Sequence, residues 1–312
     1  MGVFTEVHYF GLLVWRNLFP RGDFKAEDVP DLTGQVLLQR NAKVYMASRS
    51  REKAEAAIAQ LRDETGREAI FLELDLSSLA SVRKAASEFL RRVSATEEAE
   101  LHVLFNNAGV MGPPVNQITA DGFDLQFGTN VVGHFLFTEL LMPALFAGAQ
   151  SSSDHHARVV TTSSSAAMCG HINFATIRDG PARRRYSKEA LYAQSKLANV
   201  VVSREIAKRY GDQGIVSISV DPGSISTDLQ RYYKQAPGIG GAMTRALAPV
   251  FLRPASVGAL TQLWAGTTPE AIHENGKYAI PVARIAPCRP EAYDDMLGQE
   301  LWEYLVENVK EA

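Results

Sequence analysis

The stretch that decides the fold is Ala190-Leu191-Tyr192-Ala193-Gln194-Ser195-Lys196-Leu197-Ala198-Asn199-Val200-Val201-Val202. Its apolar residues, such as Leu197 and Val201, recur at helical spacing, so the stretch is predicted to form a helix. Tyr192 and Lys196 are four residues apart and should project from one face of that helix. A cation beside a phenol favours the phenolate and lowers the pKa of the phenol toward a range useful in acid–base chemistry. The alternative is a half-exposed tyrosine beside a solvated lysine, a pairing that many helices contain by chance.

Outward from this helix, the chain alternates between predicted strands and predicted helices. The predicted strands are residues 43–47, 69–74, 101–105, 158–162, 215–220 and 277–281. The other predicted helices run through Glu55, Ile58 and Leu61, and over residues 79–93, 123–145, 229–251, 254–267 and 291–309. Repeated strand–helix units predict an α/β protein with a doubly wound, Rossmann-like parallel sheet and helices on both of its faces. We expect a single domain over residues 31–312, preceded by an apolar extension of residues 1–30.

Composition excludes several classes of function. The chain has 312 residues and a formal net charge of -3, so it has no global attraction to nucleic acid, and small-molecule partners are favoured. Its two cysteines, Cys169 and Cys288, are far apart and lack C-x-x-C spacing, which indicates a reducing compartment such as the cytoplasm. The pair His155-His156 stands beside a polar run typical of a solvated loop. We therefore predict no metal site.

The amino-terminal extension has two alternative roles. Its apolar run over residues 4–19 is interrupted by Glu6 and Arg16 and is too short to span a bilayer. No basic residue precedes this run, which argues against a secretory signal. Five apolar residues at helical spacing are Val3, Val7, Phe10, Val14 and Leu18. They can form a helix face that lies on a membrane or one that packs on the domain, so the predicted location is cytoplasmic, with peripheral membrane contact as an alternative.

Small and polar residues follow several predicted strands, at the sheet edge where parallel sheets bind ligands. The motif Asn106-Asn107-Ala108-Gly109 follows one strand, and its small residues would let a planar ligand approach the backbone. Other strands are followed by Asp75, by Ser163-Ser164-Ser165, and by Asp221-Pro222-Gly223-Ser224-Ile225-Ser226-Thr227. Asn130 is a polar residue within a predicted apolar helix. The alternatives are ordinary turns for the loops, a helix N-cap for Asp75, and a buried, hydrogen-bonded amide for Asn130.

In their order along the chain, these motifs resemble those of the short-chain dehydrogenase/reductase family, in the branch that looks like retinol dehydrogenases and related fungal oxidoreductases. The resemblance covers most of the chain and includes the Tyr192-x-x-x-Lys196 motif. It implies that Tyr192 is the general acid that protonates a carbonyl oxygen as hydride arrives from a nicotinamide, or the base in the reverse direction. It also implies that Lys196 lowers the pKa of that phenol and holds the cofactor ribose. Ser164, rather than Ser163, would hydrogen-bond the substrate oxygen, and Asn130 would support a proton path through water.

The resemblance further implies a set of cofactor contacts. Those residues are Asp75 at the adenine, Asn107, Ala108 and Gly109 along the same channel, Tyr192 and Lys196, and Pro222, Gly223, Ile225 and Thr227 near the nicotinamide. Where an NAD enzyme usually places an acid for the ribose 2′-hydroxyl, this chain has Ala47-Ser48-Arg49. Arg49 can pair with a 2′-phosphate, so NADP is predicted in preference to NAD. The apolar carboxyl-terminal region indicates a lipophilic carbonyl compound or alcohol as substrate, although core packing explains it equally well.

The chain departs from the family at its beginning. The family opens with a strand, a T-G-x-x-x-G-x-G turn and a helix, whose amides receive the cofactor pyrophosphate. Here Thr33-Gly34-Gln35-Val36 resembles the start of that strand and Leu37-Leu38-Gln39-Arg40 the end of that helix, as though roughly twenty residues were absent. Such a truncation is expected to weaken both stability and cofactor affinity.

Three explanations of this truncation stand, in decreasing order of preference. The first is a mispredicted or alternatively spliced coding sequence. The second is a catalytically silent protein of this fold that is kept for binding or as a scaffold. The third is an enzyme that binds cofactor through its remaining contacts.

Overall fold

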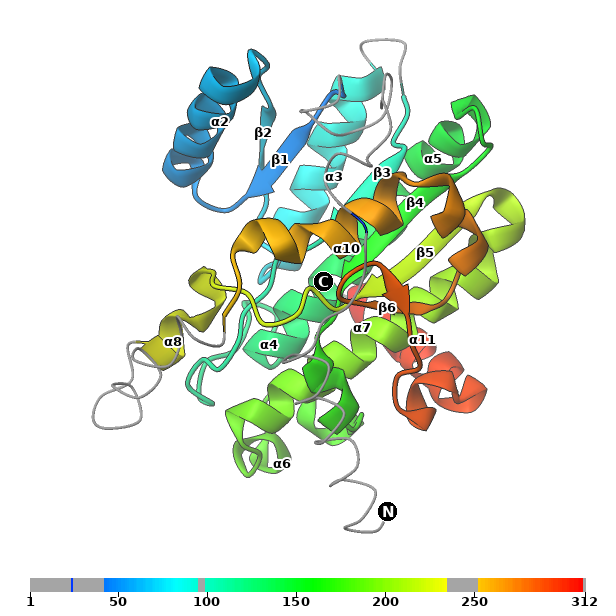
Figure 1. Cartoon of the computed structure of the whole chain (residues 1–312). Helices are drawn as coiled ribbons and strands as arrows, with labels where there is room; N and C mark the ends of the chain where they lie inside the picture. The colour runs from blue at the N-terminus through cyan, green and yellow to red at the C-terminus, as the bar shows by residue number, and fades with distance from the viewer. Residues whose placement is uncertain (1–23, 25–41, 95–98, 235–251, 311–312) are drawn as a thin grey trace.

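The computed structural model describes residue 24 and residues 42–94, 99–234 and 252–310. Nearly all of the predicted extension over residues 1–30, and the truncated unit at residues 33–40, lie outside the described residues. The division of the chain at residue 31 therefore stays a prediction. The described part is an α/β structure with helices on both sides of its strands (Figure 1).

The strands confirm the predicted parallel arrangement. They are β1 (Tyr45–Ser48), β2 (Ile70–Glu73), β3 (Val103–Asn106), β4 (Ala157–Thr162), β5 (Ile215–Val220), β6 (Tyr278–Ile280) and β7 (Arg284–Ile285). The larger sheet has the order β3-β4-β5-β6-β7, and all its pairings are parallel except the last, between β6 and β7. The strands β1 and β2 form a separate parallel pair. Among the described residues the sheet is thus divided between β1 and β3.

The helices alternate with the strands as predicted. They are α2 (Arg51–Thr65), α3 (Leu79–Ser94), α4 (Leu125–Phe127), a π turn (Gly128–Val132), α5 (Gly133–Ser151), α6 (Pro181–Arg184), α7 (Lys188–Tyr210), α8 (Arg231–Lys234), α10 (Ala255–Thr267) and α11 (Asp295–Lys310). Of the predicted helix over residues 229–251, the structure places α8, preceded by a 3-10 turn over Asp228–Gln230. Residues 235–251 lie outside the described part of the chain.

The two faces of the larger sheet carry different helices. Successive side chains of a strand point to opposite faces. Val159 of β4 packs in the main core, which α3, α5, α7 and α11 build, whereas its neighbour Val160 packs with Ala265 of α10. On the same side as α10, α2 lies against the β1–β2 pair through Ile58 (Figure 1). The doubly wound arrangement is therefore confirmed.

The apolar run Leu125–Ser151 is explained by this core. It is the one helix in the described part of the chain that is long and apolar enough to cross a membrane, yet 72% of its apolar window is buried inside the protein. Phe127, Val132 and Leu145 have no exposed surface. Its composition is that of a central core helix with neighbours on nearly all sides.

Gly133 tests how tightly α5 packs on the loop after β2. A Cβ at Gly133 would lie under 3.0 Å from the carbonyl oxygen of Leu76. We expect Gly133→Ala to lower the free energy of unfolding by about 1–3 kcal/mol, despite the better helix propensity of alanine. Urea unfolding measures this change. Gly180→Ala is the control, because a Cβ there meets no atom within 4 Å. Equal stability of both variants would show that the α5 contact is not close.

Candidate active site

Tyr192 and Lys196 lie on the buried part of α7. Their side chains belong to residues that are 7% and 3% exposed, respectively. The helix is started by Ser187, whose hydroxyl accepts a hydrogen bond of 3.1 Å from the amide of Ala190. The alternative of a half-exposed tyrosine beside a solvated lysine is therefore wrong. Both groups lie in surroundings of low polarity, where electrostatic effects are strong.

Ser164 is the partner of the Tyr192 phenol. Ser164 follows β4 in extended conformation and begins a 3-10 turn, Ser165–Cys169. Its side chain hydrogen-bonds Tyr192, an interaction that favours the phenolate. Ser163, by contrast, is buried and donates a 2.7 Å hydrogen bond to the carbonyl oxygen of Lys196. The geometry therefore brings Ser164, and not Ser163, to the phenol.

The pKa values of the pair differ from the expectation drawn from the resemblance. Burial raises the pKa of Tyr192 above its ordinary range, and the charge of Asp221 adds to this effect. Burial also lowers the pKa of Lys196 to about 8. The expected lowering of the phenol pKa by Lys196 is therefore wrong for this structure: burial raises the pKa of Tyr192, and the hydrogen bond from Ser164 is what opposes the rise. The Lys196 ammonium is 5.7 Å from the centre of the Tyr192 ring and donates to the Thr162 carbonyl oxygen at 2.9 Å.

Asp221 was noted in the sequence only as the first residue of a polar loop, without a role at the site. It is 2% exposed, follows β5 directly, and its charge acts on both Tyr192 and Lys196. For Lys196 the carboxylate opposes desolvation, because it favours the ammonium form. An acidic residue directly after a buried strand was the signal that could have indicated this role.

Asn130 acts as a structural brace. It lies in the π turn, is fully buried, and its Oδ1 accepts a hydrogen bond of 2.8 Å from the Val110 amide. Its Nδ2 donates to the Val110 carbonyl and to Ser195 Oγ, both at 3.0 Å. The buried, hydrogen-bonded amide is thus the arrangement observed. Its side-chain amide is already engaged on both atoms, so the proton path through water stays a prediction.

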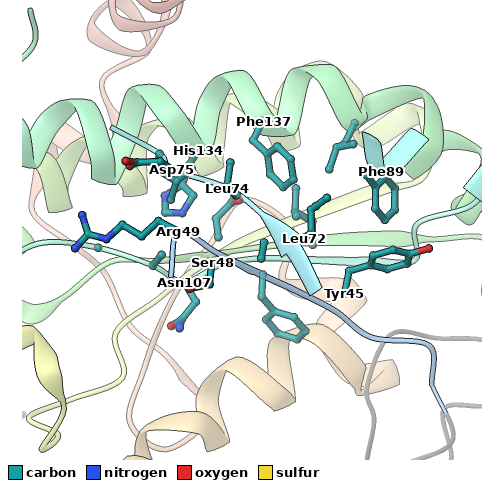
Figure 2. Close-up of a pocket in the computed structure, with 18 of the residues that line it drawn as sticks. Tyr45, Ser48, Arg49, Leu72, Leu74, Asp75, Phe89, Asn107, His134 and Phe137 are labelled. Atoms are coloured by element: carbon teal, nitrogen blue, oxygen red, sulfur yellow. The ribbon is translucent and has the colours of Figure 1, made fainter. Parts of the chain in front are cut away.

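A cavity of about 470 Å³ lies between the β1–β2 pair and β3. Figure 2 shows Arg49, Asp75, Asn107 and His134 at one end and Tyr45 at the other. Five predicted cofactor residues line this one cavity, namely Arg49, Asp75, Asn107, Ala108 and Gly109. The structure therefore brings together the residues assigned to the adenosine half of a dinucleotide.

Gly109 lies between this cavity and the predicted catalytic residues Asn130 and Lys196. A Cβ at Gly109 would lie 3.0 Å from Asn130 Oδ1 and 3.7 Å from Lys196 Nζ. Only glycine leaves that space open. Asn107 is held beside it by hydrogen bonds that its Oδ1 accepts from Thr162 Oγ1, at 3.2 Å, and from Gln262 Nε2, at 2.8 Å. Gln262 of α10 is a further contact that sequence reasoning missed, since nothing marked it in the helix.

Asp75 is not a helix N-cap. Its Oδ1 accepts hydrogen bonds from the amide and the hydroxyl of Ser77, at 2.9 and 2.6 Å. The helix α3 begins at Leu79, whose amide donates to Asp121 Oδ2 at 2.9 Å instead. Asp75 therefore closes a local turn at the polar end of the cavity.

The predicted nicotinamide contacts lie apart from the cavity, in the loop after β5. Pro222, Gly223, Ile225 and Thr227 do not line it. Gly223 has a φ of 77°, in the left-handed region that favours glycine, and its amide donates to Asp221 Oδ1 at 2.8 Å. The carbonyl of Ile225 accepts from Gln230 Nε2 at 2.6 Å, and Ile225 pairs with Arg253 in an isolated bridge. The loop is thus held rigidly beside the buried Asp221.

These residues fit a dinucleotide cofactor at its two ends. Arg49 and Asn107 suit a phosphorylated adenosine, and Gly109 keeps a passage open toward Lys196. The pyrophosphate at the centre of a dinucleotide lacks the glycine-rich turn that binds it in the family, because the chain has no glycine between Gly34 and Gly66. No cluster of three or more metal-ligating side chains occurs in the described ranges.

His134 offers a test of burial next to Asn130, one of the predicted catalytic residues. Its Nδ1 lies 3.0 Å from the Asn130 carbonyl oxygen, and burial lowers its pKa from 6.5 to about 4. In the unfolded chain His134 therefore binds a proton below about pH 6.5, whereas in the folded chain it does so only below about pH 4. We expect stability to be lost between those values, and to be lost less in His134→Gln. Urea unfolding at pH 7 and pH 5 measures the difference. His273→Gln, at an exposed position, should keep the wild-type loss; a His134→Gln variant that behaves like it would contradict the assignment.

Comparisons with known proteins agree with this geometry. A family model for short chain dehydrogenases matches residues 32–176. A short-chain dehydrogenase/reductase of Armillaria gallica is 49% identical over 92% of this chain and 94% of its own length. The alignment is 303 positions long, which is more than 92% of this chain, so some of its positions are gaps in this chain. Human retinol dehydrogenase 13 is 34% identical over 86% of this chain and 78% of its own length.

Solved structures share the fold. A crystal structure of an uncharacterized protein from Mycobacterium paratuberculosis has a TM-score of 0.69 and 28% identity, covering 93% of this chain and 98% of that one. A gluconate 5-dehydrogenase from Burkholderia cenocepacia, in complex with NADP and tartrate, has a TM-score of 0.56 and 20% identity, covering 78% and 84% of the two chains. Fold, motifs and relatives agree, and the chain belongs to the short-chain dehydrogenase/reductase family of oxidoreductases.

Proposed function

We propose that this protein is an NADP-dependent oxidoreductase that interconverts a lipophilic carbonyl compound and its alcohol. The observation that carries the proposal is the buried Tyr192 phenol, hydrogen-bonded to Ser164, with the Lys196 ammonium near its ring. This group stands beside a cavity with Arg49 at its polar end (Figure 2). The retinol dehydrogenases among its relatives support a lipophilic substrate. The proposed location is cytoplasmic, with peripheral membrane contact through residues 1–30 as the alternative.

The proton chemistry follows from the two hydroxyl groups. NADP, when bound in its reduced form, supplies the hydride of such a reaction. Tyr192 donates its phenolic proton to the carbonyl oxygen, and the Ser164 hydroxyl holds the same oxygen. The raised pKa of Tyr192 keeps the phenol protonated, which suits an acid in the direction of reduction. Because the pKa of Lys196 is about 8, its ammonium group can release a proton near neutral pH and take one up again from water.

Arg49 is proposed to select NADP. Relatives of this fold from Burkholderia cenocepacia were solved with NADP, which supports the choice. A guanidinium that pairs with the 2′-phosphate contributes about 1.5–3 kcal/mol, so Arg49→Ala should weaken NADPH binding about 10- to 100-fold and leave NADH binding unchanged. Titration followed by tryptophan fluorescence and calorimetry measures this effect. The matched control is Arg51→Ala, because Arg51 pairs with Glu55 on α2. Equal losses for both cofactors would remove Arg49 from this role.

Tyr192 is proposed to be the general acid. Tyr192→Phe should lower kcat/KM for NADPH-dependent reduction of lipophilic aldehydes and ketones by about 10²- to 10⁴-fold, because the proton donor is lost. The assay is run on the chain as it stands and on a chain in which the truncated unit has been restored. Tyr210→Phe on the same helix is the control, since its hydroxyl contacts Glu139 and not the site. Activity that persists in Tyr192→Phe would refute the mechanism.

A catalytically silent binding or scaffold protein of the same fold is the second candidate. Two observations favour it: the chain has no glycine between Gly34 and Gly66, and among the described residues the sheet is divided between β1 and β3. A folded chain that does not bind NADPH would support this candidate. Carbonyl reduction by the chain as it stands would exclude it.

A further inference from the structure

The division of the sheet creates a cavity between two strand edges. In the described part of the chain, β1 has β2 as its one neighbour and β3 has β4. The cavity of about 470 Å³ is lined by residues of β1 on one side and of β3 on the other. Both strands end at the polar end of the cavity, where Figure 2 shows Ser48, the last residue of β1, and Asn107, which directly follows β3. The two strands therefore run in the same direction along its walls.

The main chain of β1 points into this cavity at alternate residues. The amide of Ile70 donates to the Val44 carbonyl at 2.8 Å, and the amide of Leu74 donates to the Ser48 carbonyl at 3.1 Å. In a parallel ladder every second residue bonds to the neighbouring strand, and the residues between them face the other way. The amide and carbonyl groups of Tyr45 and Ala47 consequently face the cavity, which both residues line.

The main chain of β3 mirrors this arrangement. The amide of Arg158 donates to the His102 carbonyl at 2.8 Å, so His102 and Leu104 bond to β4. By the same alternation, the amide and carbonyl groups of Val103 and the amide of Phe105 face the cavity from the opposite side, and both residues line it. The Phe105 carbonyl already accepts a hydrogen bond of 3.0 Å from the Asn107 amide. Two parallel edges with donors and acceptors thus stand across one space.

The strand β1 is less buried than the strands inside the larger sheet. Every residue of β4 and β5 is buried, whereas Ala47 in the middle of β1 is exposed and the other three residues are half-buried. Apolar side chains close the cavity on the side of α3 and α5, among them Phe89, Phe137 and Leu141. The space therefore has the surroundings of an interior strand position.

The hydrogen-bonding edges select the occupant. An apolar small molecule would fill the volume but leave the facing amides and carbonyls without partners, each at a cost of about 1–3 kcal/mol. An extended peptide satisfies both edges at once and buries its side chains on the apolar walls. Interior parallel strands are rich in apolar, β-branched residues, and β5 of this chain, Ile-Val-Ser-Ile-Ser-Val, has four of them.

We propose that the cavity between β1 and β3 is a binding site for an extended, apolar, β-branched peptide segment supplied in trans. The segment runs parallel to both strands, accepts and donates hydrogen bonds on both edges, and joins β1–β2 to the larger sheet. The segment takes the apolar interior of the cavity, whereas the residues proposed to hold the cofactor stand at its polar end, so an absence of peptide binding would not count against the proposed function. It gives the second candidate function a concrete ligand.

The test uses the full chain and a synthetic peptide with the β5 sequence, Ile-Val-Ser-Ile-Ser-Val, flanked by two lysines at each end for solubility. Amide hydrogen exchange is measured by NMR with and without peptide. At a peptide concentration ten times Kd, the amides of Tyr45, Ala47, Val103 and Phe105 should exchange about tenfold more slowly. The amides of Met46 and Leu104, already bonded to β2 and β4, serve as internal references and should change less.

Two matched controls test whether the peptide binds through main-chain hydrogen bonds. Ala47→Pro removes one donor that faces the cavity without touching the β1–β2 ladder and should weaken peptide binding, whereas Ala47→Val keeps the donor and should not. The same peptide with proline at its third and fifth positions between the lysines should fail to bind the wild-type chain, which keeps the test valid if Ala47→Pro does not fold. Three results would overturn the proposal: no saturable binding, binding without slower exchange at the four amides, or amides in the free chain already as slow as those of Met46 and Leu104.

Discussion

The contact between α7 and the end of β4 is the constraint on which the site depends. Thr162 offers its carbonyl oxygen to Lys196 Nζ at 2.9 Å and to Asn199 Nδ2 at 3.0 Å, while Ser163 donates back to the Lys196 carbonyl at 2.7 Å. These bonds fix the side of α7 that faces the sheet edge. With α7 fixed in this way, the Tyr192 phenol lies beside Ser164, the residue that follows Ser163. A one-residue slip of the strand would exchange the two serines.

Burial at this contact sets the acid–base properties of the pair. Because the surroundings are poor in water, the charged forms of both side chains are disfavoured: the pKa of Tyr192 rises and that of Lys196 falls to about 8. Asp221 counteracts the second effect, since its carboxylate favours the ammonium. At neutral pH the Tyr192 side chain is therefore a neutral phenol that can donate a proton. Its phenolate form is unfavourable in this buried site unless a positive charge lies close to it.

The division of the sheet between β1 and β3, in the part of the chain that the structure describes, connects an apolar interior to a polar edge. The cavity runs from an apolar interior, near Phe89, to a polar end with Arg49 and Asp75 (Figure 2). A group that fills the interior and contacts β1 also affects the position of Arg49, because Arg49 immediately follows the last residue of β1. A strand held on one edge has more freedom than one held on both. Placement of the guanidinium and completion of the sheet are therefore physically coupled.

Much of the fold could be predicted from the order of elements along the chain. The boundaries of β5, residues 215–220, and the start of α3 at Leu79 agree with the predicted ones, because long buried runs and clear periodicity carry strong signals. The Tyr192–Lys196 spacing predicted that both lie on one helix face, and the Asn107–Gly109 motif predicted a site at the end of its strand, where these residues line the cavity. Local chemistry is sufficient for such statements, since they concern residues a few positions apart.

Other properties depend on which segments meet in space. The role of Asn130 as a brace for Val110 and Ser195, the charge of Asp221 on the catalytic pair, and the raised pKa of Tyr192 all require contacts between distant parts of the chain. The same holds for the cavity between β1 and β3, whose walls are more than fifty residues apart in sequence. The sequence by itself determined the order of strands and helices and the chemical groups on offer. Only the tertiary structure decided their burial and their partners, because desolvation and hydrogen bonding depend on neighbours that spacing along the chain does not specify.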